Sequence, residues 1–150
     1  ASGRGLECFW QPGVRLEQVA SLSAVLSLAQ HTKASRQKSA LSALKGELST
    51  DDLFQAVRVG DAFARSLIES VAWVHGWVVW QLCALFDPQK IIFTGPLAEL
   101  GELYFAPVRK AAAQWGGTKP DVAITGSTLG TYNGALGAAA LALHQWKPKR

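Results

Sequence analysis

The stretch that decides the fold runs from Leu85 to Ala98 and reads LFDPQKIIFTGPLA. An apolar helical pattern ends at Asp87-Pro88, because proline lacks the N–H that a helix needs and restricts the residue before it. The β-branched and aromatic run Lys90–Thr94 then predicts a strand, and Gly95-Pro96 predicts the turn that closes it. A helical pattern follows the turn, so a helix, a strand and a second helix succeed one another directly.

A second unit of the same kind follows. The run Asp121–Thr125, closed by Gly126, predicts a second strand, and helical patterns cover Ala98–Trp115 and Tyr132–Trp146. Strands joined by a helix pair in parallel, so we expect an α/β fold. Two strands make a thin sheet, which would normally continue into strands outside this sequence. With 49% hydrophobic residues in a chain of 150, residues 1–150 are expected to form a single domain.

The chain before these units is expected to be helical. Helices are predicted over Arg15–Gln30 and, with one polar face, over Arg36–Glu47. Ser49 stands ahead of a threonine and two aspartates, a pattern that caps a helix and places negative charge at its positive end. The sequence therefore predicts that a long helix starts here, kinks near Gly60 and runs to Phe86.

The first residues indicate a piece of a longer polypeptide. Met is absent, also at position 1, and residues 1–14 hold four Gly or Pro, which predicts a loop. No charged segment followed by an apolar one opens the chain, so we expect a cytoplasmic protein.

Charge and hydropathy argue against two kinds of partner. The net charge is +4, but the basic residues are scattered, so this segment is not expected to bind nucleic acid. The apolar run Val71–Phe86 is shorter than the roughly 20 residues that a membrane span needs. It predicts a buried helix and no membrane contact.

Four segments follow one another in the order and spacing of a known family pattern: Gly60-Asp61, Leu85–Ala98, Ser127–Gly130 and Ala135–Ala139. The pattern consists of a Gly-Asp helix, a Pro-containing turn with an apolar strand and a Gly-rich turn, and a C-terminal helix. With it the sequence resembles the ROK family of bacterial sugar kinases and sugar-responsive transcription regulators. The resemblance implies a ribonuclease H-like, actin-like ATPase fold, of which this helix-rich chain with its small parallel sheet would be most of the C-terminal lobe.

Many members of that family hold a structural zinc with the motif Cys-x-Cys-Gly-x-x-Gly-Cys-x-Glu and a nearby upstream His. The run Leu16–Ser21 matches the end of the motif and the helix after it. Cys8 falls on the first cysteine, but Trp10 and Arg15 occupy the second and third. Zinc needs about four N or S ligands. We therefore predict that the zinc is lost and expect no cofactor in this chain.

Two residues match binding positions of the family. Glu17 matches the glutamate that, by the resemblance, accepts hydrogen bonds from sugar hydroxyls, a task for which a carboxylate offers two acceptor oxygens. A Glu in the first turn equally complements the helix dipole. Gly95 falls where nucleotide-binding members bring a glycine turn close to ATP. We favour the alternative that this turn needs glycine for its own geometry, since Pro96 stiffens it.

Three tryptophans, Trp73, Trp77 and Trp80, recur on one face of the long helix. Such a stripe is typical of an interface core and equally of an ordinary core. We predict a mixture, with at least one Trp at an interface, and expect a homo-oligomer.

No complete active site is present in the sequence. Phosphoryl transfer needs a phosphate-cradling loop and a base that takes the proton of the sugar hydroxyl. In ROK kinases the Asp-x-Gly-x-Thr phosphate loop and the catalytic Asp belong to the N-terminal lobe, which this chain lacks. This chain alone is not expected to phosphorylate a sugar. Binding of ATP and magnesium is expected only if the parent protein is a kinase.

Three functions remain open. We favour the sugar-binding and dimerisation part of a ROK-family transcriptional regulator, because a protein that only senses its ligand tolerates loss of the zinc motif. Its partner would be a sugar or a sugar phosphate, and it would contact DNA only through an N-terminal domain outside this sequence. The first alternative is the C-terminal lobe of an ATP-dependent, glucokinase-like sugar kinase. The second is a non-catalytic interaction module.

Overall fold

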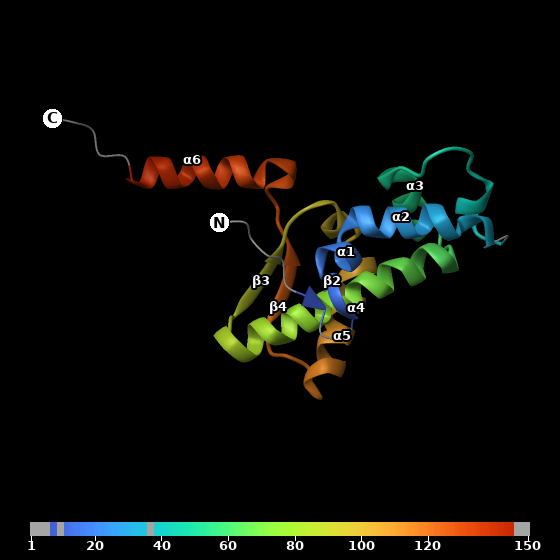
Figure 1. Ribbon diagram of the computed structural model, residues 1–150. Helices are drawn as coiled ribbons and strands as arrows, with labels where there is room; N and C mark the ends of the chain where they lie inside the picture. Colours follow the sequence, from blue (N-terminus) through green and yellow to red (C-terminus); the bar gives the residue numbers. More distant parts are fainter. Residues whose placement is uncertain (1–6, 9–10, 36–37, 146–150) are drawn as a thin grey trace.

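The structure is a computed structural model that describes residues 7–8, 11–35 and 38–145 (Figure 1). Its helices and strands follow in this order: β1 (Glu7–Cys8), β2 (Gln11–Arg15), α1 (Glu17–Ala20), α2 (Leu22–Thr32), η1 (Lys33–Ser35), η2 (Ala40–Ala43), α3 (Thr50–Arg58), α4 (Ala62–Phe86), β3 (Lys90–Phe93), η3 (Pro96–Leu100), α5 (Glu102–Gly116), β4 (Ala123–Gly126), η4 (Gly130–Tyr132) and α6 (Asn133–Gln145).

The long helix α4 is the centre of the molecule, and α5 packs against it. Helix α4 buries small and branched side chains, among them Ala64, Val71 and Val79. Gly76 permits the close approach of the two helices, because a Cβ at this position would lie only 2.4 Å from the Cβ of Ala111. The helix predicted over Val71–Phe86 is confirmed, but it is buried only as far as Val79, and Leu85 and Phe86 at its end are 70% and 72% exposed. Within the described part of the chain, no helix combines the length and the apolar character needed to cross a membrane.

The long helix predicted from Ser49 onward is in fact two helices. Its start is confirmed by a capping box, in which Ser49 Oγ accepts the N–H of Asp52 at 3.1 Å and Asp52 accepts the N–H of Ser49 at 2.9 Å. Instead of a kink, Gly60 has a φ of +89°, which no helix can continue. Asp61 then starts α4 afresh by accepting the N–H of Ala64 at 2.8 Å.

Asp61 also fastens the segment before α3 to the start of α4. Its carboxylate accepts the hydroxyl of Ser39 at 3.0 Å and the N–H of Ala40 at 2.7 Å. Burial pushes the pKa of this carboxyl upward, but the N–H groups of Ala64 and Ala40 and the Ser39 hydroxyl outweigh it and hold the pKa below its usual range. Asp61 is therefore ionised at neutral pH and joins two segments.

The predicted helix over Arg36–Glu47 is wrong for the part that the structure describes, from residue 38 on. The chain forms only the short 3-10 helix η2, whose Leu41 is buried. Ser39 Oγ accepts the N–H of Leu41 at 3.2 Å, and Asp61 takes the N–H of Ala40. Side chains that capture backbone donors in this way compete with a regular helix.

The loop predicted over residues 1–14 contains a short antiparallel hairpin among its described residues, with Glu7 of β1 opposite Arg15 of β2. The helix predicted from Arg15 begins at Glu17 and is interrupted at Ser21, whose extended backbone separates α1 from α2. The Ser21 hydroxyl accepts the N–H of Ala24 at 3.2 Å and so caps α2. Apolar residues recur on both sides of this break because both helices pack against α4.

The two strands β3 and β4 pair in parallel, as predicted, with Ile91 opposite Ile124 and Phe93 opposite Gly126. Ile91 and Phe93 pack on the core, whereas Ile92 points outward and is 56% exposed. The sheet therefore has one apolar face against the helices and one open face.

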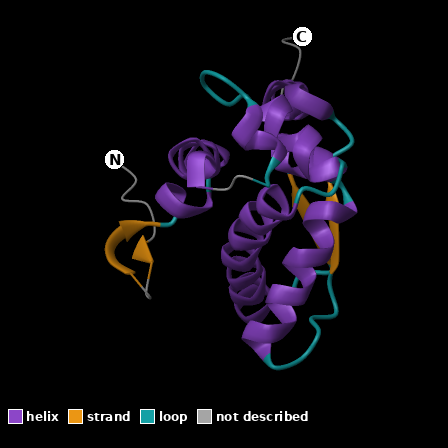
Figure 2. Ribbon diagram, turned by 90° about the vertical axis from the view of Figure 1, so that its right-hand side faces the viewer, coloured by secondary structure: helices purple, strands orange, loops and turns teal. Residues whose placement is uncertain are grey.

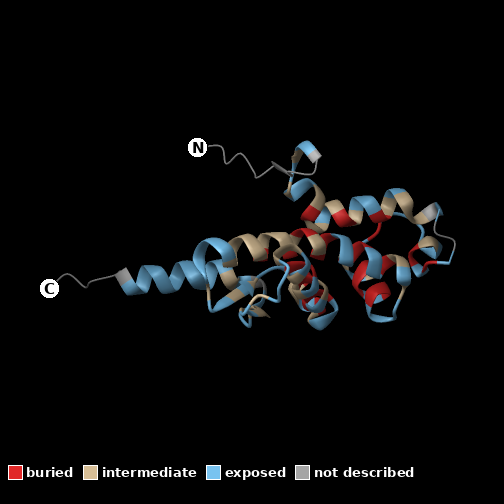
Figure 3. Ribbon diagram, turned by 90° about the horizontal axis from the view of Figure 1, so that it is seen from below, coloured by how far each residue is buried: buried red, intermediate tan, exposed pale blue. Residues whose placement is uncertain are grey.

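The helix predicted over Ala98–Trp115 starts only at Glu102. The 3-10 helix η3 precedes it, and Gly101, with a φ of +55°, separates the two. The last predicted helix is confirmed as α6. It is exposed along the part whose side chains are described and extends away from the body of the molecule (Figure 3).

Replacing Asp61 by Ala removes the cap of α4 and the tie to Ala40. We expect the free energy of unfolding to fall by at least about 2.5 kcal/mol, because a helix cap is worth about 1 kcal/mol and a hydrogen bond to a charged group about 1.5–3 kcal/mol. Equilibrium urea unfolding measures this change. The matched control is Asp51→Ala, in the exposed first turn of α3, which should cost less than about 0.5 kcal/mol. Equal losses in the two variants would contradict the role of Asp61.

Candidate functional site

A hollow of about 430 Å³ opens at the carboxyl ends of β3 and β4. Both strands of a parallel pair end on the same edge, which is where ligands bind in open α/β folds. The lining comes from the loops after the two strands and from the start of α6: Phe93, Thr94, Gly95, Pro96, Ala98, Glu99, Ser127, Gly130, Asn133 and Gly134.

Gly95 lies in the wall of this hollow. Its φ is +95° and its ψ is 174°, and a Cβ there would meet no atom within 4 Å. The backbone conformation, and not a lack of space, requires glycine at this position. Pro96 follows as the first residue of η3 and contributes no N–H. The structure thus places Gly95 beside a hollow of ligand size, while its contact with a nucleotide stays a prediction.

The loop after β4 closes the opposite wall. Ser127 Oγ contacts Asn133 Oδ1 and accepts the N–H of Leu129 at 3.1 Å, and Asn133 Nδ2 donates to the carbonyl of Gly130. Among the described residues that line the hollow, Glu99 is the one charged residue. Sequence reasoning missed Ser127 and Asn133, although a polar run directly after a parallel strand is a signal for such an edge.

Glu17 is presented at a different place, as the first residue of α1, with its side chain 63% exposed. The turn before it is fixed, because Gln18 Oε1 accepts the backbone N–H of Arg15 at 2.7 Å. The Arg15 guanidinium lies 3.9 Å from the Glu17 carboxylate. The carboxylate oxygens of Glu17 are thus open to a ligand on a backbone that is held in place.

The structure does not bring Glu17 and Gly95 together. Helix α1 packs on one side of α4, and the sheet lies on the other side (Figure 2). Two separate surfaces result, one around Glu17 and one at the strand ends.

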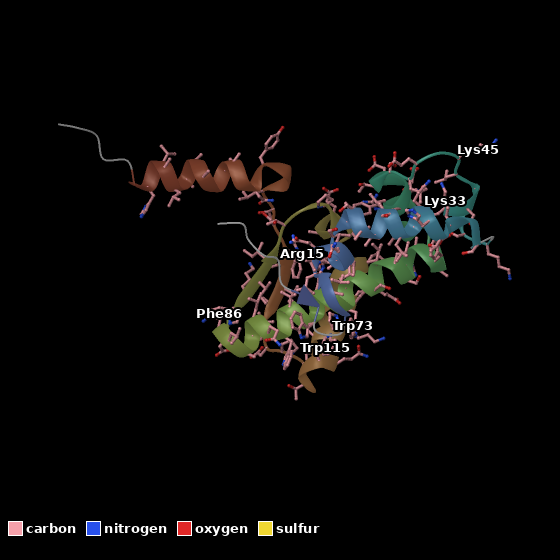
Figure 4. All side chains as sticks on the ribbon, in the orientation of Figure 1. Arg15, Lys33, Lys45, Trp73, Phe86 and Trp115 are labelled. Atoms are coloured by element: carbon pink, nitrogen blue, oxygen red, sulfur yellow. The ribbon has the colours of Figure 1, made fainter. Side chains whose placement is uncertain are left out.

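The tryptophan stripe is in part an internal contact. The rings of Trp73 and Trp115 lie 4.4 Å apart between centroids, and Trp115 Nε1 donates to the carbonyl of Trp73 at 3.2 Å (Figure 4). Trp80 covers Gly116, where a Cβ would lie 2.8 Å from its ring. Trp73, Trp77 and Trp80 are all half-buried. Trp73 and Trp80 thus pack between α4 and α5. A further role of the stripe in an interface with another chain stays a prediction.

The residues at the family's zinc position do not make a zinc site by their chemistry. Trp10 and the side chain of Cys8 lie outside the described residues. Arg15, at the third cysteine position, carries a guanidinium, which does not ligate zinc. The described residues contain no group of three His, Cys, Asp or Glu side chains placed to hold a metal ion.

A buried polar pair supports the wall of the hollow from behind. The Tyr104 hydroxyl and His75 Nδ1 form a hydrogen bond of 2.5 Å, and the Phe93 ring lies 6.0 Å from the His75 ring and 5.7 Å from the Tyr104 ring. Burial lowers the pKa of His75 and raises that of Tyr104. The imidazole is therefore neutral at pH 7, and the tyrosine keeps its proton.

The model of the ROK family matches residues 1–145. A glucokinase of Halalkalibacterium halodurans is 28% identical over 98 residues, which are 63% of this chain and 30% of the glucokinase. The DNA-binding transcriptional repressor Mlc of Escherichia coli is 32% identical over 111 residues, which are 73% of this chain and 27% of the repressor. The chain thus spans less than a third of the length of these relatives.

Solved structures match the fold. A ROK family glucokinase from Streptomyces griseus, in complex with glucose and AMPPNP, has a TM-score of 0.77 at 29% identity, over 93% of this chain and 48% of that one. A ROK family transcriptional regulator, homologous to Mlc of E. coli, has a TM-score of 0.62 at 21% identity, over 83% of this chain and 32% of that one. The expected fold, part of a ribonuclease H-like, actin-like ATPase fold, is confirmed.

The neutral state of His75 makes stability depend on pH. Because burial lowers its pKa below the ordinary value of 6.5, the unfolded chain binds the proton first as the pH falls. The stabilisation is complete above pH 6.5 and is lost below it, so urea unfolding should show falling stability between about pH 7 and pH 5. His75→Gln should flatten this slope, whereas His144→Gln, on the exposed α6, should leave it unchanged. An unaltered slope in His75→Gln would assign the dependence to other groups.

Proposed function

This chain belongs to the ROK family, and we propose that it is the sugar-binding part of a sugar-responsive transcription regulator. The observation that carries the proposal is the placement of Glu17. Its carboxylate is exposed at the start of α1, on a turn that Gln18 fixes through the N–H of Arg15. Sugar hydroxyls can donate hydrogen bonds, and an ionised carboxylate accepts them with both of its oxygens.

Helix α1, which carries this carboxylate, is held in place by packing on the core. Ala20 of α1 is buried, and Leu16 and Val19 pack partly on the core. The helix that bears Glu17 is thus tied to α4, the most extensively packed element. A binding group on a supported helix is held in position better than one on a free loop.

One feature supports a regulator over a kinase. The cysteine motif is interrupted at Trp10 and Arg15, and a protein that only senses its ligand tolerates such a loss. The similarity to the repressor Mlc agrees with this proposal.

A sugar kinase is the second candidate, favoured by one observation. Gly95 stands beside the hollow at the edge where α/β folds bind nucleotides, and the glucokinase of Streptomyces griseus, in complex with AMPPNP, has the same fold. In this alternative the phosphate loop, the catalytic base and the site for magnesium-ATP lie outside this chain.

The remaining parts of the proposal concern the whole protein. We place the regulator in the cytoplasm, where it contacts DNA through a segment outside this chain. Self-association through the tryptophan stripe of α4 completes the proposal, without a structural zinc.

Replacing Glu17 by Gln in the full-length protein tests the sugar site. Calorimetric titration with neutral hexoses, N-acetyl hexosamines and their 6-phosphates should find one saturable ligand. The variant should bind it roughly tenfold more weakly or worse, because hydrogen bonds to a charged group contribute about 1.5–3 kcal/mol. The matched control is Glu47→Gln, an exposed carboxylate elsewhere, which should bind as the parent does.

Turnover of magnesium-ATP with the bound sugar would select the kinase. Sugar-dependent release from DNA, without turnover, would select the regulator. Full sugar affinity in Glu17→Gln would remove Glu17 from the site, and no response to any sugar would leave the lobe as an interaction module.

A further inference from the structure

A second hollow, of about 370 Å³, lies in the groove between α4 and α5. Its walls include Glu69 and Trp73 of α4 and Ala106, Pro107, Lys110 and Gln114 of α5. It shares no lining residue with the hollow at the strand ends. Small-molecule sites occupy about 300–1,000 Å³ and combine an apolar wall with a few polar groups. The groove therefore has the size and the composition of a site for a small ligand.

The apolar part of the groove is fixed by packing. The Trp73 ring lies 4.4 Å from the Trp115 ring between centroids, and the Trp73 carbonyl accepts the Nε1–H of Trp115 at 3.2 Å (Figure 4). Ala111, which also lines the groove, is buried at the close approach to Gly76. Pro107 lies inside α5 and presents an apolar ring that donates no hydrogen bond. The groove is thus formed before a ligand arrives.

Two opposite charges stand at the groove, one on each wall. Glu69 belongs to α4 and Lys110 to α5, and both residues are exposed. Both helices are described throughout, and among the described residues neither of these side chains forms an ion pair or a hydrogen bond. Glu102, in the shallower continuation of the groove, is by contrast paired with Arg109. The Glu69 carboxylate and the Lys110 ammonium are therefore free to pair with a ligand.

We propose that this groove binds a small zwitterion with an apolar body, either an amino acid or a short peptide with an apolar side chain. Glu69 accepts hydrogen bonds from the ammonium group, Lys110 donates to the carboxylate, and the apolar side chain lies against Trp73 and Pro107. The amide of Gln114 both donates and accepts, so it serves the carboxylate or a peptide bond. This site is separate from the one proposed at Glu17 and does not rest on it.

The charge pattern selects this class of ligand. An anionic ligand is attracted by Lys110 but repelled by Glu69, and a cationic ligand meets the reverse, so each has one favourable and one unfavourable contact. A neutral apolar ligand gains from neither charge. A ligand that carries both signs pairs with both walls at once, and this complementarity gives the groove its specificity.

Matched ligands test the class. The full-length protein is titrated calorimetrically with leucine, phenylalanine and leucyl-leucine, and with the N-acetyl and the amide derivative of each, which lack the ammonium and the carboxylate respectively. We expect at least one zwitterion to saturate the site and to raise the melting temperature, because a ligand that binds only the folded state stabilises it. Its two derivatives should bind roughly tenfold more weakly, and its affinity should fall as KCl rises. The single amino acids and the dipeptide distinguish the two sources of the ligand.

Variants of the two charges locate the site. Glu69→Gln should remove the advantage of the zwitterion over its N-acetyl derivative, and Lys110→Gln its advantage over the amide, since each variant deletes one charge pair. Combining Glu69→Lys with Lys110→Glu should restore part of the affinity, because a zwitterion can bind in the opposite direction. Ala106→Phe fills the groove from an exposed helical position and should abolish binding. The controls Lys45→Gln and Glu47→Gln, at exposed charges outside the groove, should bind as the parent does.

Three results would overturn the proposal. One is that no zwitterion of the panel binds or raises the melting temperature. Another is equal affinity for a zwitterion and its two derivatives, which would remove the charge pairing. The third is binding that persists unchanged in Ala106→Phe, which would place the ligand outside the groove. None of these results alters the sugar titration of Glu17→Gln, so the two proposals fail independently.

Discussion

The close approach of α4 and α5 at Gly76 is the constraint on which the structure depends. The backbone of α5 at Ala111 and Ala112 occupies the space that a side chain at position 76 would need. Each strand of the sheet follows one of these helices, β3 after α4 and β4 after α5. The distance between the helices therefore sets where the strands begin, and with it the edge at which their loops enclose the hollow. The tilted ring contact between Trp73 and Trp115 joins α4 and α5 at the same crossing.

Strong local signals made much of the fold predictable. The strand at Lys90–Phe93, its parallel partner and the end of α4 before Pro88 follow from β-branched runs and from proline, which act within a few residues. The breaks at Ser21 and Gly101 were not predicted, because apolar periodicity continues across them, and the break at Gly60 was predicted only as a kink. Tertiary hydrogen bonds determine the conformation of the segment after residue 38. There Asp61, which lies far along the chain, accepts the N–H of Ala40 that a regular helix would use. Single-sequence patterns contain no information on such contacts.

The residues of the candidate sites also fall into two groups, those that a local motif identifies and those that only the tertiary structure brings together. Glu17 and Gly95 were selected because each matches a motif, and the structure places the first on an exposed turn and the second beside a hollow. Their roles in binding stay predictions. Ser127 and Asn133 come together only when β4 ends beside β3, so the polar wall of the hollow required the sheet register. The tryptophan stripe shows the limit of periodicity, which identifies a shared face but not what covers it. Here α5 covers part of it.

The segment that carries Glu17 is held in place by packing. The bond from the Arg15 N–H to Gln18 contributes about 1 kcal/mol and ties the end of β2 to α1. Packing of α1 adds to it through buried Ala20 and the partly buried Val19. The backbone of Glu17 is thus supported both by the core beneath α1 and by the turn before it.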